Sequence, residues 1–137
     1  MSFAIDARLE AETRPVGELG LSRLLLMDDA RYPWLILVPR IAGARELLDL
    51  DEADRAMLLG EISLVSRALE ALFKPDKLNI AALGNVVPQL HLHLLVRYQT
   101  DAAWPQPVWG RGEREPYTDD ARERRIALLR DALKTGP

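Results

Sequence analysis

Polar and apolar residues alternate in the segment Gln89-Leu90-His91-Leu92-His93-Leu94-Leu95. The pattern extends to Tyr98, and a period of two is typical of a strand that buries one face. Residues two apart on such a strand share a face, with α-carbons roughly 6.6 Å apart. We therefore expect a strand from Gln89 to Tyr98. His91 and His93, which are the two histidines of the chain, are expected beside Gln89 on its polar face.

Three further apolar runs flank this strand. The runs at 21–27 and 34–41 are separated by a polar segment that ends in Pro33, so they are expected to form a hairpin or a strand-loop-strand unit. The run at 78–83 is expected to be another strand, which stops at Gly84 because glycine breaks regular structure.

A long helix is indicated between these strands by apolar residues three and four positions apart. These residues are Leu58, Ile62, Val65, Leu69 and Leu72. Asp51 can cap this helix and Pro75 stops it, while Thr118 can cap a final helix near the C-terminus. Strands and helices that do not alternate favour the α+β class. We expect a single domain over residues 1–137, with an antiparallel sheet of about five strands, one long helix and a C-terminal helix.

The composition is that of an ordinary globular protein. Of the 137 residues, 48% are hydrophobic and 28% are charged, and the net charge of -3 offers no general attraction to nucleic acid or to an anionic membrane. The absence of cysteine excludes disulfides, thiolate catalysis and cysteine-type zinc sites. No segment has the pattern of a signal peptide or of a membrane span, so we expect a cytoplasmic protein.

Two histidines on one strand face are compatible with two kinds of chemistry, and also with a plain exposed polar face. Neighbouring imidazoles can ligate zinc, but a third ligand would have to come from elsewhere, and no spacing supplies one convincingly. A neutral imidazole can instead attack phosphorus, while a neighbouring imidazolium protonates the leaving group. Spacing alone leaves these alternatives open.

The segment from Gln89 to Leu95 resembles the signature of the histidine triad (HIT) family, His-x-His-x-His-x-x with hydrophobic residues at x, at every place but the first. Residues 78–88 are similar to the family's strand and phosphate-side turn, and residues 34–40 to its strand that ends in a proline and a basic residue. The resemblance covers roughly residues 21–98. It implies a small α+β nucleotide-binding fold, commonly a homodimer, with no metal or other cofactor.

The resemblance also implies an activity and residue roles. The family cleaves phosphoanhydride, phosphoramidate or related bonds at the α-phosphate of a nucleoside monophosphate derivative. His91 corresponds to the nucleophile that becomes transiently nucleotidylated, and His93 to the histidine beside the transferred phosphate and the leaving group. The candidates for nucleotide binding are Asn79, Gly84 and Asn85 on the phosphate side, and Asp28 or its neighbour Asp29 at the ribose.

Gln89 stands where the family has its first histidine, which is not the attacking group. A glutamine amide has both a donor and an acceptor, so it can support His91 without titrating. The alternative interpretation is a nucleotide-binding or adaptor protein with impaired catalysis.

The tryptophans and Arg97 are open to more than one interpretation. Trp34 can line a base pocket or belong to the core, and we favour the core. Trp104 and Trp109 can close over a ligand or pack between subunits, and we favour packing. Arg97 shares the histidine face of the predicted strand, and we expect it to be solvated.

Overall fold

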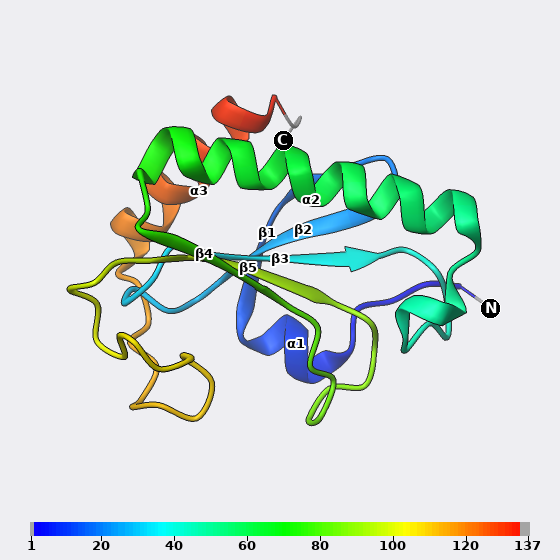
Figure 1. The fold of residues 1–137 in the computed structure, drawn as a ribbon, viewed down its shortest axis with the longest axis horizontal. Coiled ribbons are helices and arrows are strands. Elements are labelled where there is room, and N and C mark those ends of the chain that lie inside the picture. The colour runs from blue at the N-terminus through cyan, green and yellow to red at the C-terminus, as the bar shows by residue number, and fades with distance from the viewer. Residues whose placement is uncertain (1, 135–137) are drawn as a thin grey trace.

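The computed structural model describes residues 2–134, which are built around a five-stranded antiparallel sheet (Figure 1). The strands are β1 (Thr13–Glu18), β2 (Ser22–Met27), β3 (Trp34–Pro39), β4 (Lys77–Ala81) and β5 (Leu92–Arg97). They lie in the order β1-β2-β3-β5-β4. The helices are α1 (Ala7–Ala11), α2 (Glu52–Phe73) and α3 (Asp119–Leu133), with a short 3₁₀ turn, η1, at Leu47–Asp49. The predicted α+β class and the sheet of about five strands are confirmed.

The two faces of the sheet pack against different parts of the chain. Figure 1 shows α2 and α3 on one face, and α1 with the loop after β5 on the other. Successive side chains of a strand point to opposite faces, so Leu35 and Leu37 of β3 join the core under the helices, while Trp34 and Ile36 join a second cluster on the opposite face. That second face carries the histidine of β5.

The hairpin and the two long helices form where the sequence predicts them. Strands β2 and β3 pair antiparallel, with Leu24 opposite Leu37. The Asp51 carboxylate accepts from the backbone N–H of Asp54 at the start of α2, and Lys74 ends that helix in the left-handed conformation. Thr118 caps α3 in the same way as Asp51 caps α2.

Strand β1 is absent from the sequence-based expectation because Pro15 and Gly17 interrupt its pattern. Both residues are tolerated because β1 lies at the edge of the sheet, where one side of the strand needs no partner. Its register with β2 shifts between Pro15 and Gly17, as in a β-bulge.

The predicted strand over residues 89–98 is wrong at its ends, because β5 spans only Leu92–Arg97. Its pairing with β3 ends at Leu37 opposite Leu92. Two residues further along β3 comes Pro39, which has no N–H to donate, and the N–H of Leu90 donates instead to the carbonyl of Ala44. The segment from 89 to 91 therefore leaves the ladder. The strand expected over 78–83 also ends early, at Ala81.

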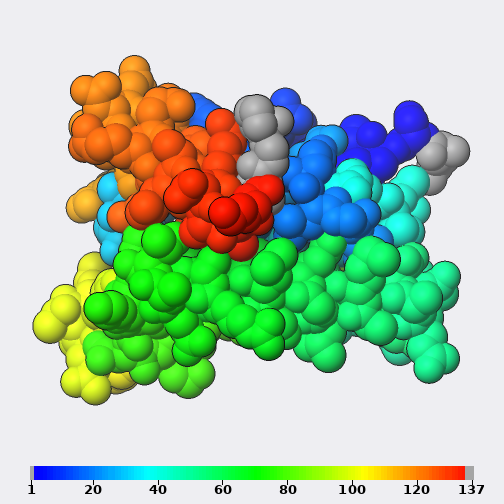
Figure 2. Space-filling view, turned by 90° about the horizontal axis from the view of Figure 1, so that it is seen from above, coloured from blue at the N-terminus to red at the C-terminus, as the bar shows by residue number. Residues whose placement is uncertain are grey.

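Helix α3 lies along only one flank of α2. Figure 2, seen from the helical side, shows the opposite flank of α2 uncovered. No helix within residues 2–134 is long and apolar enough to cross a membrane.

Candidate active site

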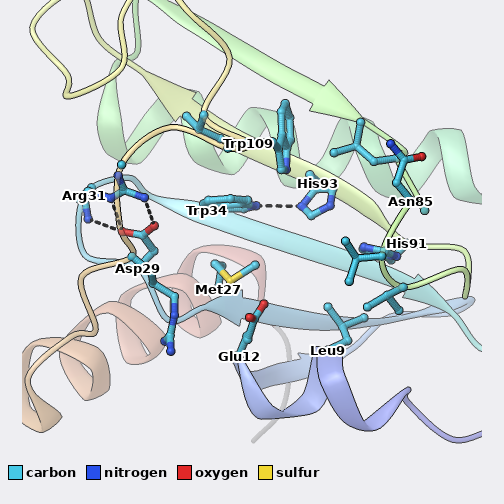
Figure 3. A pocket seen from close by; sticks show the side chains of 18 residues that line it. Leu9, Glu12, Met27, Asp29, Arg31, Trp34, Asn85, His91, His93 and Trp109 are labelled. Carbon is cyan, nitrogen blue, oxygen red and sulfur yellow. Dashed lines mark hydrogen bonds and ion pairs between the residues drawn. The ribbon is translucent and has the colours of Figure 1, made fainter.

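A cavity of about 490 Å³ opens on the sheet face opposite α2 and α3 (Figure 3). Its floor includes His91, His93 and Trp34, which come from β5, the residues just before it, and β3. Its walls are the turn at 83–87 and the loop segment at 108–114. The sheet thus brings both histidines to one hollow, although only His93 lies within a strand.

His91 has one ring nitrogen committed to a main-chain group. Its Nδ1 lies 2.7 Å from the carbonyl oxygen of Gln89. A carbonyl oxygen only accepts, so Nδ1 donates and carries the proton of the neutral ring. The lone pair on Nε2 is therefore available in the cavity. This arrangement suits a nucleophile, because in the neutral ring Nε2 offers its lone pair and the contact at Nδ1 holds the ring in place.

His93 is oriented by the indole of Trp34, whose Nε1 donates to His93 Nδ1 at 3.0 Å (Figure 3). The His93 side chain is 5% exposed. Burial, and to a smaller extent the positive charge that His91 can carry, together lower the pKa of His93 to about 3. His93 is consequently neutral near pH 7. Its ring centroid lies 4.8 Å from that of His91.

Trp109 belongs to the loop wall of the cavity and packs against its floor. The ring centroid of Trp109 lies 5.3 Å from that of His93 and 6.1 Å from that of Trp34. The Nε1 atom of Trp109 is buried and has no hydrogen-bond partner among the described residues. Trp34 belongs both to the core cluster and to the cavity floor. Trp104 lies elsewhere and packs against the guanidinium of Arg97, 5.6 Å from the ring centroid.

The turn after β4 contributes Gly84 and Asn85 to the cavity lining. Gly84 has a φ of 78°, a left-handed conformation that favours glycine. The guanidinium of Arg8 donates to the carbonyl of Val86 at 2.8 Å, so this turn is also tied to the N-terminal segment.

Of the two neighbouring aspartates, the structure places Asp29 in the cavity lining and Asp28 outside it. The Asp28 carboxylate accepts from the N–H of Tyr117 at 2.9 Å. Asp29 accepts from Arg31 at 3.0 Å from Nε and 2.8 Å from Nη2. Adjacent residues leaving β2 point to opposite sides, which explains why only one of them reaches the cavity. A side chain at Gly112 would lie 2.8 Å from Arg31, so this glycine gives the guanidinium its room.

Asn79 and Arg97 form a separate buried network. The Asn79 side-chain oxygen accepts from Arg97 at 2.8 Å, and Asn79 is not part of the cavity lining. Arg97 also donates to both carboxylate oxygens of Asp101, at 2.8 and 3.0 Å. The expectation that Arg97 is solvated is wrong, since its side chain is 2% exposed. The loop after β5 folds back and places Asp101 against it.

The side-chain amide of Gln89 holds the N-terminal segment. Its Oε1 accepts from the N–H of Asp6, and its Nε2 donates to the carbonyl of Ala4, each at 2.8 Å. Support for His91 therefore comes from the Gln89 main chain and not from its amide. The segment held in this way brings Leu9 and Glu12 into the cavity lining. Sequence reasoning missed both, because no motif marks that segment.

The metal alternative has no third ligand in the part of the chain that the structure describes. Within residues 2–134, no group of three or more His, Cys, Asp or Glu side chains is placed to hold a metal ion. The site consists of two imidazoles, a glycine-containing turn and an aromatic wall.

Comparisons with known proteins matched one family model and several solved structures. The family model for the HIT domain matches residues 8–100. A histidine triad protein from Bradyrhizobium japonicum is 48% identical, with 97% of this chain and 99% of that chain covered and a TM-score of 0.95. One from Marinobacter aquaeolei is 47% identical over 98% of each chain, with a TM-score of 0.95. One from Sinorhizobium meliloti is 43% identical over 95% and 96%, with a TM-score of 0.92. Comparison with curated proteins gave no match. On the family match and these three structures, the chain belongs to the histidine triad (HIT) family.

Proposed function

We propose that the protein is a nucleotide hydrolase or nucleotidyl transferase. It would cleave a phosphoanhydride or phosphoramidate bond at the α-phosphate of a nucleoside monophosphate derivative, through a covalent nucleotidyl-histidine on His91. The observation that carries the proposal is the Nδ1 contact of His91 with the Gln89 carbonyl, which leaves the Nε2 lone pair in the cavity. Family membership supports a nucleotide ligand in general.

The reaction follows from this arrangement in two displacements. The Nε2 lone pair of His91 forms a bond to the α-phosphorus, and the bond from phosphorus to the leaving group breaks with its electron pair. The nucleotidylated ring is then cationic, and its Nδ1–H makes a stronger, charge-assisted hydrogen bond to the Gln89 carbonyl. Water, or another acceptor, then bonds to the same phosphorus while the bond from phosphorus to Nε2 breaks. Its electron pair returns to Nε2, a proton of the attacking water passes to the solvent, and His91 regains its original state.

The size and lining of the cavity support a mononucleotide ligand. A volume of about 490 Å³ lies within the usual range of roughly 300–1,000 Å³ for small-molecule sites. We place the phosphate between the histidines and the turn with Gly84 and Asn85, and the nucleoside toward Asp29. The Oδ2 atom of Asp29 accepts one hydrogen bond from Arg31, which leaves it capacity for a ribose hydroxyl.

The proposal is tested by intact-mass measurement after incubation with nucleoside 5′-phosphoanhydrides and phosphoramidates. We expect an adduct of one nucleotidyl group in the unaltered protein and none in His91→Ala or in the more conservative His91→Asn. Thermal unfolding of both variants checks that the fold is retained. Undiminished turnover by either variant would overturn the assignment of His91.

A binding or adaptor function is the second candidate, and the position of Gln89 is the observation that favours it. The side-chain amide of the first motif residue is hydrogen-bonded to the N-terminal segment, and only its main-chain carbonyl contacts His91. This alternative predicts that calorimetry detects binding of a nucleoside monophosphate, while no adduct and no turnover appear with any nucleotidyl substrate.

We also propose a homodimer formed through the free edge of β4. This strand lies at one end of the sheet, and an unpaired edge is a template for another strand. Ile80 and Leu83 are each 46% exposed there, and Leu48 is 87% exposed beside Leu83 in a shared hollow. Helix α2 also carries the exposed Leu59. A second copy of the chain, paired through its own β4, fits an open strand edge that is bordered by apolar residues.

A further inference from the structure

Trp34 determines which ring nitrogen of His93 carries a proton. An indole N–H only donates, and it lies 3.0 Å from His93 Nδ1, so Nδ1 must offer its lone pair. Both side chains are buried, with 6% of Trp34 and 5% of His93 exposed. The proton of the neutral ring therefore lies on Nε2. A second proton, on Nδ1, would abolish the hydrogen bond and bury two facing N–H groups.

The two histidines consequently have opposite tautomers. His91 is protonated at Nδ1 and offers a lone pair at Nε2, whereas His93 offers an N–H at Nε2. Both rings line the same cavity. One ring thus supplies the electron pair that attacks phosphorus. The other supplies a hydrogen bond to an oxygen of the transferred phosphate or of the leaving group.

We propose that the site acts on phosphoanhydrides and discriminates against phosphoramidates, because His93 is a fixed hydrogen-bond donor and not a proton source. This inference rests on the proposed function and narrows its substrate class. It makes Trp34 a positioning residue, which acts on the reaction through the tautomer of His93.

Leaving-group chemistry connects the tautomer to the substrate. When the phosphorus–oxygen bond of an anhydride breaks, the electron pair departs on a phosphate oxygen, which is a stable anion and needs no proton. When a phosphorus–nitrogen bond breaks, the electron pair departs on nitrogen, which must gain a proton to leave as an amine. A neutral imidazole that gave up its Nε2 proton would become an imidazolate, so His93 cannot supply that proton near neutral pH.

The other titratable groups of the cavity lie away from the histidines. They are Glu12, Asp29, Arg31 and Arg114. Figure 3 shows Asp29 and Arg31 paired on the far side of Trp34, with Glu12 near Met27. The groups that contact His93 from β3 and from the loop are the indoles of Trp34 and Trp109, which are not acids at these pH values. Within the described residues, the rings that contact His93 are those of Trp34, Trp109 and His91, so His91 is the one titratable group among them.

A series of substrates with different leaving groups measures whether the site supplies a proton to the leaving group. Aryl esters of one nucleoside 5′-monophosphate, made from phenols of graded pKa, are mixed with excess protein, and formation of the nucleotidyl adduct is timed. Without a proton donor, the rate should fall steeply, approaching about tenfold for each unit of leaving-group pKa. In a direct comparison near pH 7.5, a nucleoside 5′-diphosphate should react about a hundredfold faster than the matching phosphoramidate, the lower end of what a general acid contributes.

The outcomes separate the two proposals. Adducts that form at rates nearly independent of leaving-group pKa, or equally fast from anhydride and phosphoramidate, overturn this inference and leave the proposed function standing. No adduct from any substrate overturns the proposed function, and the inference with it.

Nitrogen NMR of histidine-labelled protein tests the structural step without any activity. The chain has two histidines, so a His91 variant assigns both spectra. We expect His91 as the Nδ1–H tautomer and His93 as the Nε2–H tautomer.

Trp34→Phe keeps an aromatic ring but removes the hydrogen-bond donor to His93, so His93 should become a mixture of tautomers. Adduct formation should slow by about tenfold or less, the value of one hydrogen bond. Trp109→Phe is the matched control and should leave the His93 tautomer unchanged. A pure Nε2–H tautomer that persists in Trp34→Phe would overturn the role of Trp34.

Discussion

At the scale of single residues, His91 and His93 differ because of their neighbours and not because of their place in the motif. A main-chain carbonyl faces Nδ1 of the first, and an indole N–H faces Nδ1 of the second. The sequence predicts that the two side chains lie together. It could not predict their tautomers, because Trp34 comes from a strand 59 positions away in the sequence. The low pKa of His93 favours a neutral hydrogen-bond donor over the imidazolium that the sequence also allows as a proton source.

Stability should depend on pH through His93. Its pKa is about 3 in the folded protein, because of burial and the charge of His91, against 6.5 for the ordinary side chain. Between these values the unfolded chain binds a proton that the folded chain does not, so the free energy of unfolding falls as pH decreases from about 7 toward 3. One such proton gives a slope of at most about 1.4 kcal/mol per pH unit. Urea unfolding between pH 7 and 5, where carboxylates contribute least, measures the slope.

His93→Asn is the comparison for this effect, since asparagine does not titrate. Its slope over the same interval should be smaller than that of the unaltered protein. Equal slopes would show that His93 takes up its proton in both states and would contradict the low pKa.

A second residue-scale prediction concerns the buried pair of Arg97 and Asp101. Both side chains are almost fully enclosed, at 2% and 4% exposure. Removing one partner leaves the other charge buried, so Arg97→Ala should lower the free energy of unfolding by about 3–5 kcal/mol. The exposed pair of Arg23 and Glu18 is the control, and Arg23→Ala should change stability by about 0–1 kcal/mol. Chemical denaturation of both variants measures the two losses of unfolding free energy. Similar losses would contradict the prediction that the buried pair stabilises the fold more than the exposed pair.

At the scale of elements, the sequence predicts best where one periodic pattern runs without interruption. Strands β2 and β3 and helices α2 and α3 each carry such a pattern with a clear boundary residue, and they form as expected. Strand β1 and helix α1 do not, because Pro15 and Gly17 break the first and the second is only Ala7–Ala11. Both are held by tertiary contacts, and the wall that α1 adds to the cavity was therefore not predictable.

The N-terminal segment should loosen when Gln89 is changed. The amide makes two hydrogen bonds to its main chain, and each is worth about 1 kcal/mol. Gln89→Leu should therefore speed hydrogen exchange over residues 3–12 by about tenfold or more, since local opening becomes easier. Gln89→His restores the family's histidine, but an imidazole does not have the two-sided amide, so exchange should rise there too.

The exchange rate of α2 is the internal control for these variants, because α2 contacts neither end of the Gln89 amide. Unchanged exchange over residues 3–12 would contradict the anchoring role. A gain in turnover by Gln89→His would show that the first motif position acts on the reaction and not on the N-terminal segment.

At the scale of the whole molecule, β4 lies at an edge of the sheet and carries the exposed Ile80, and Figure 2 shows that the flank of α2 away from α3 is also open. The turn at 82–88 joins this edge to His91, and Leu83 lies at the border of both hollows. A partner at this edge would therefore also steady the phosphate-side turn. The sequence contains these residues, but only the strand order shows that they meet at an edge.

Ile80→Lys should accordingly convert a dimer into a monomer. The side chain is 46% exposed on β4, so lysine is tolerated in the isolated chain, whereas a two-fold contact would bring two charges together. Leu128→Lys is the matched control, because Leu128 is 44% exposed but lies on α3, on the other flank of α2. Light scattering after size exclusion should give twice the chain mass for the unaltered protein and for Leu128→Lys, and the single chain mass for Ile80→Lys. A monomer in the unaltered protein would reject the dimer. A dimer that survives in Ile80→Lys but not in Leu128→Lys would move the interface to α3.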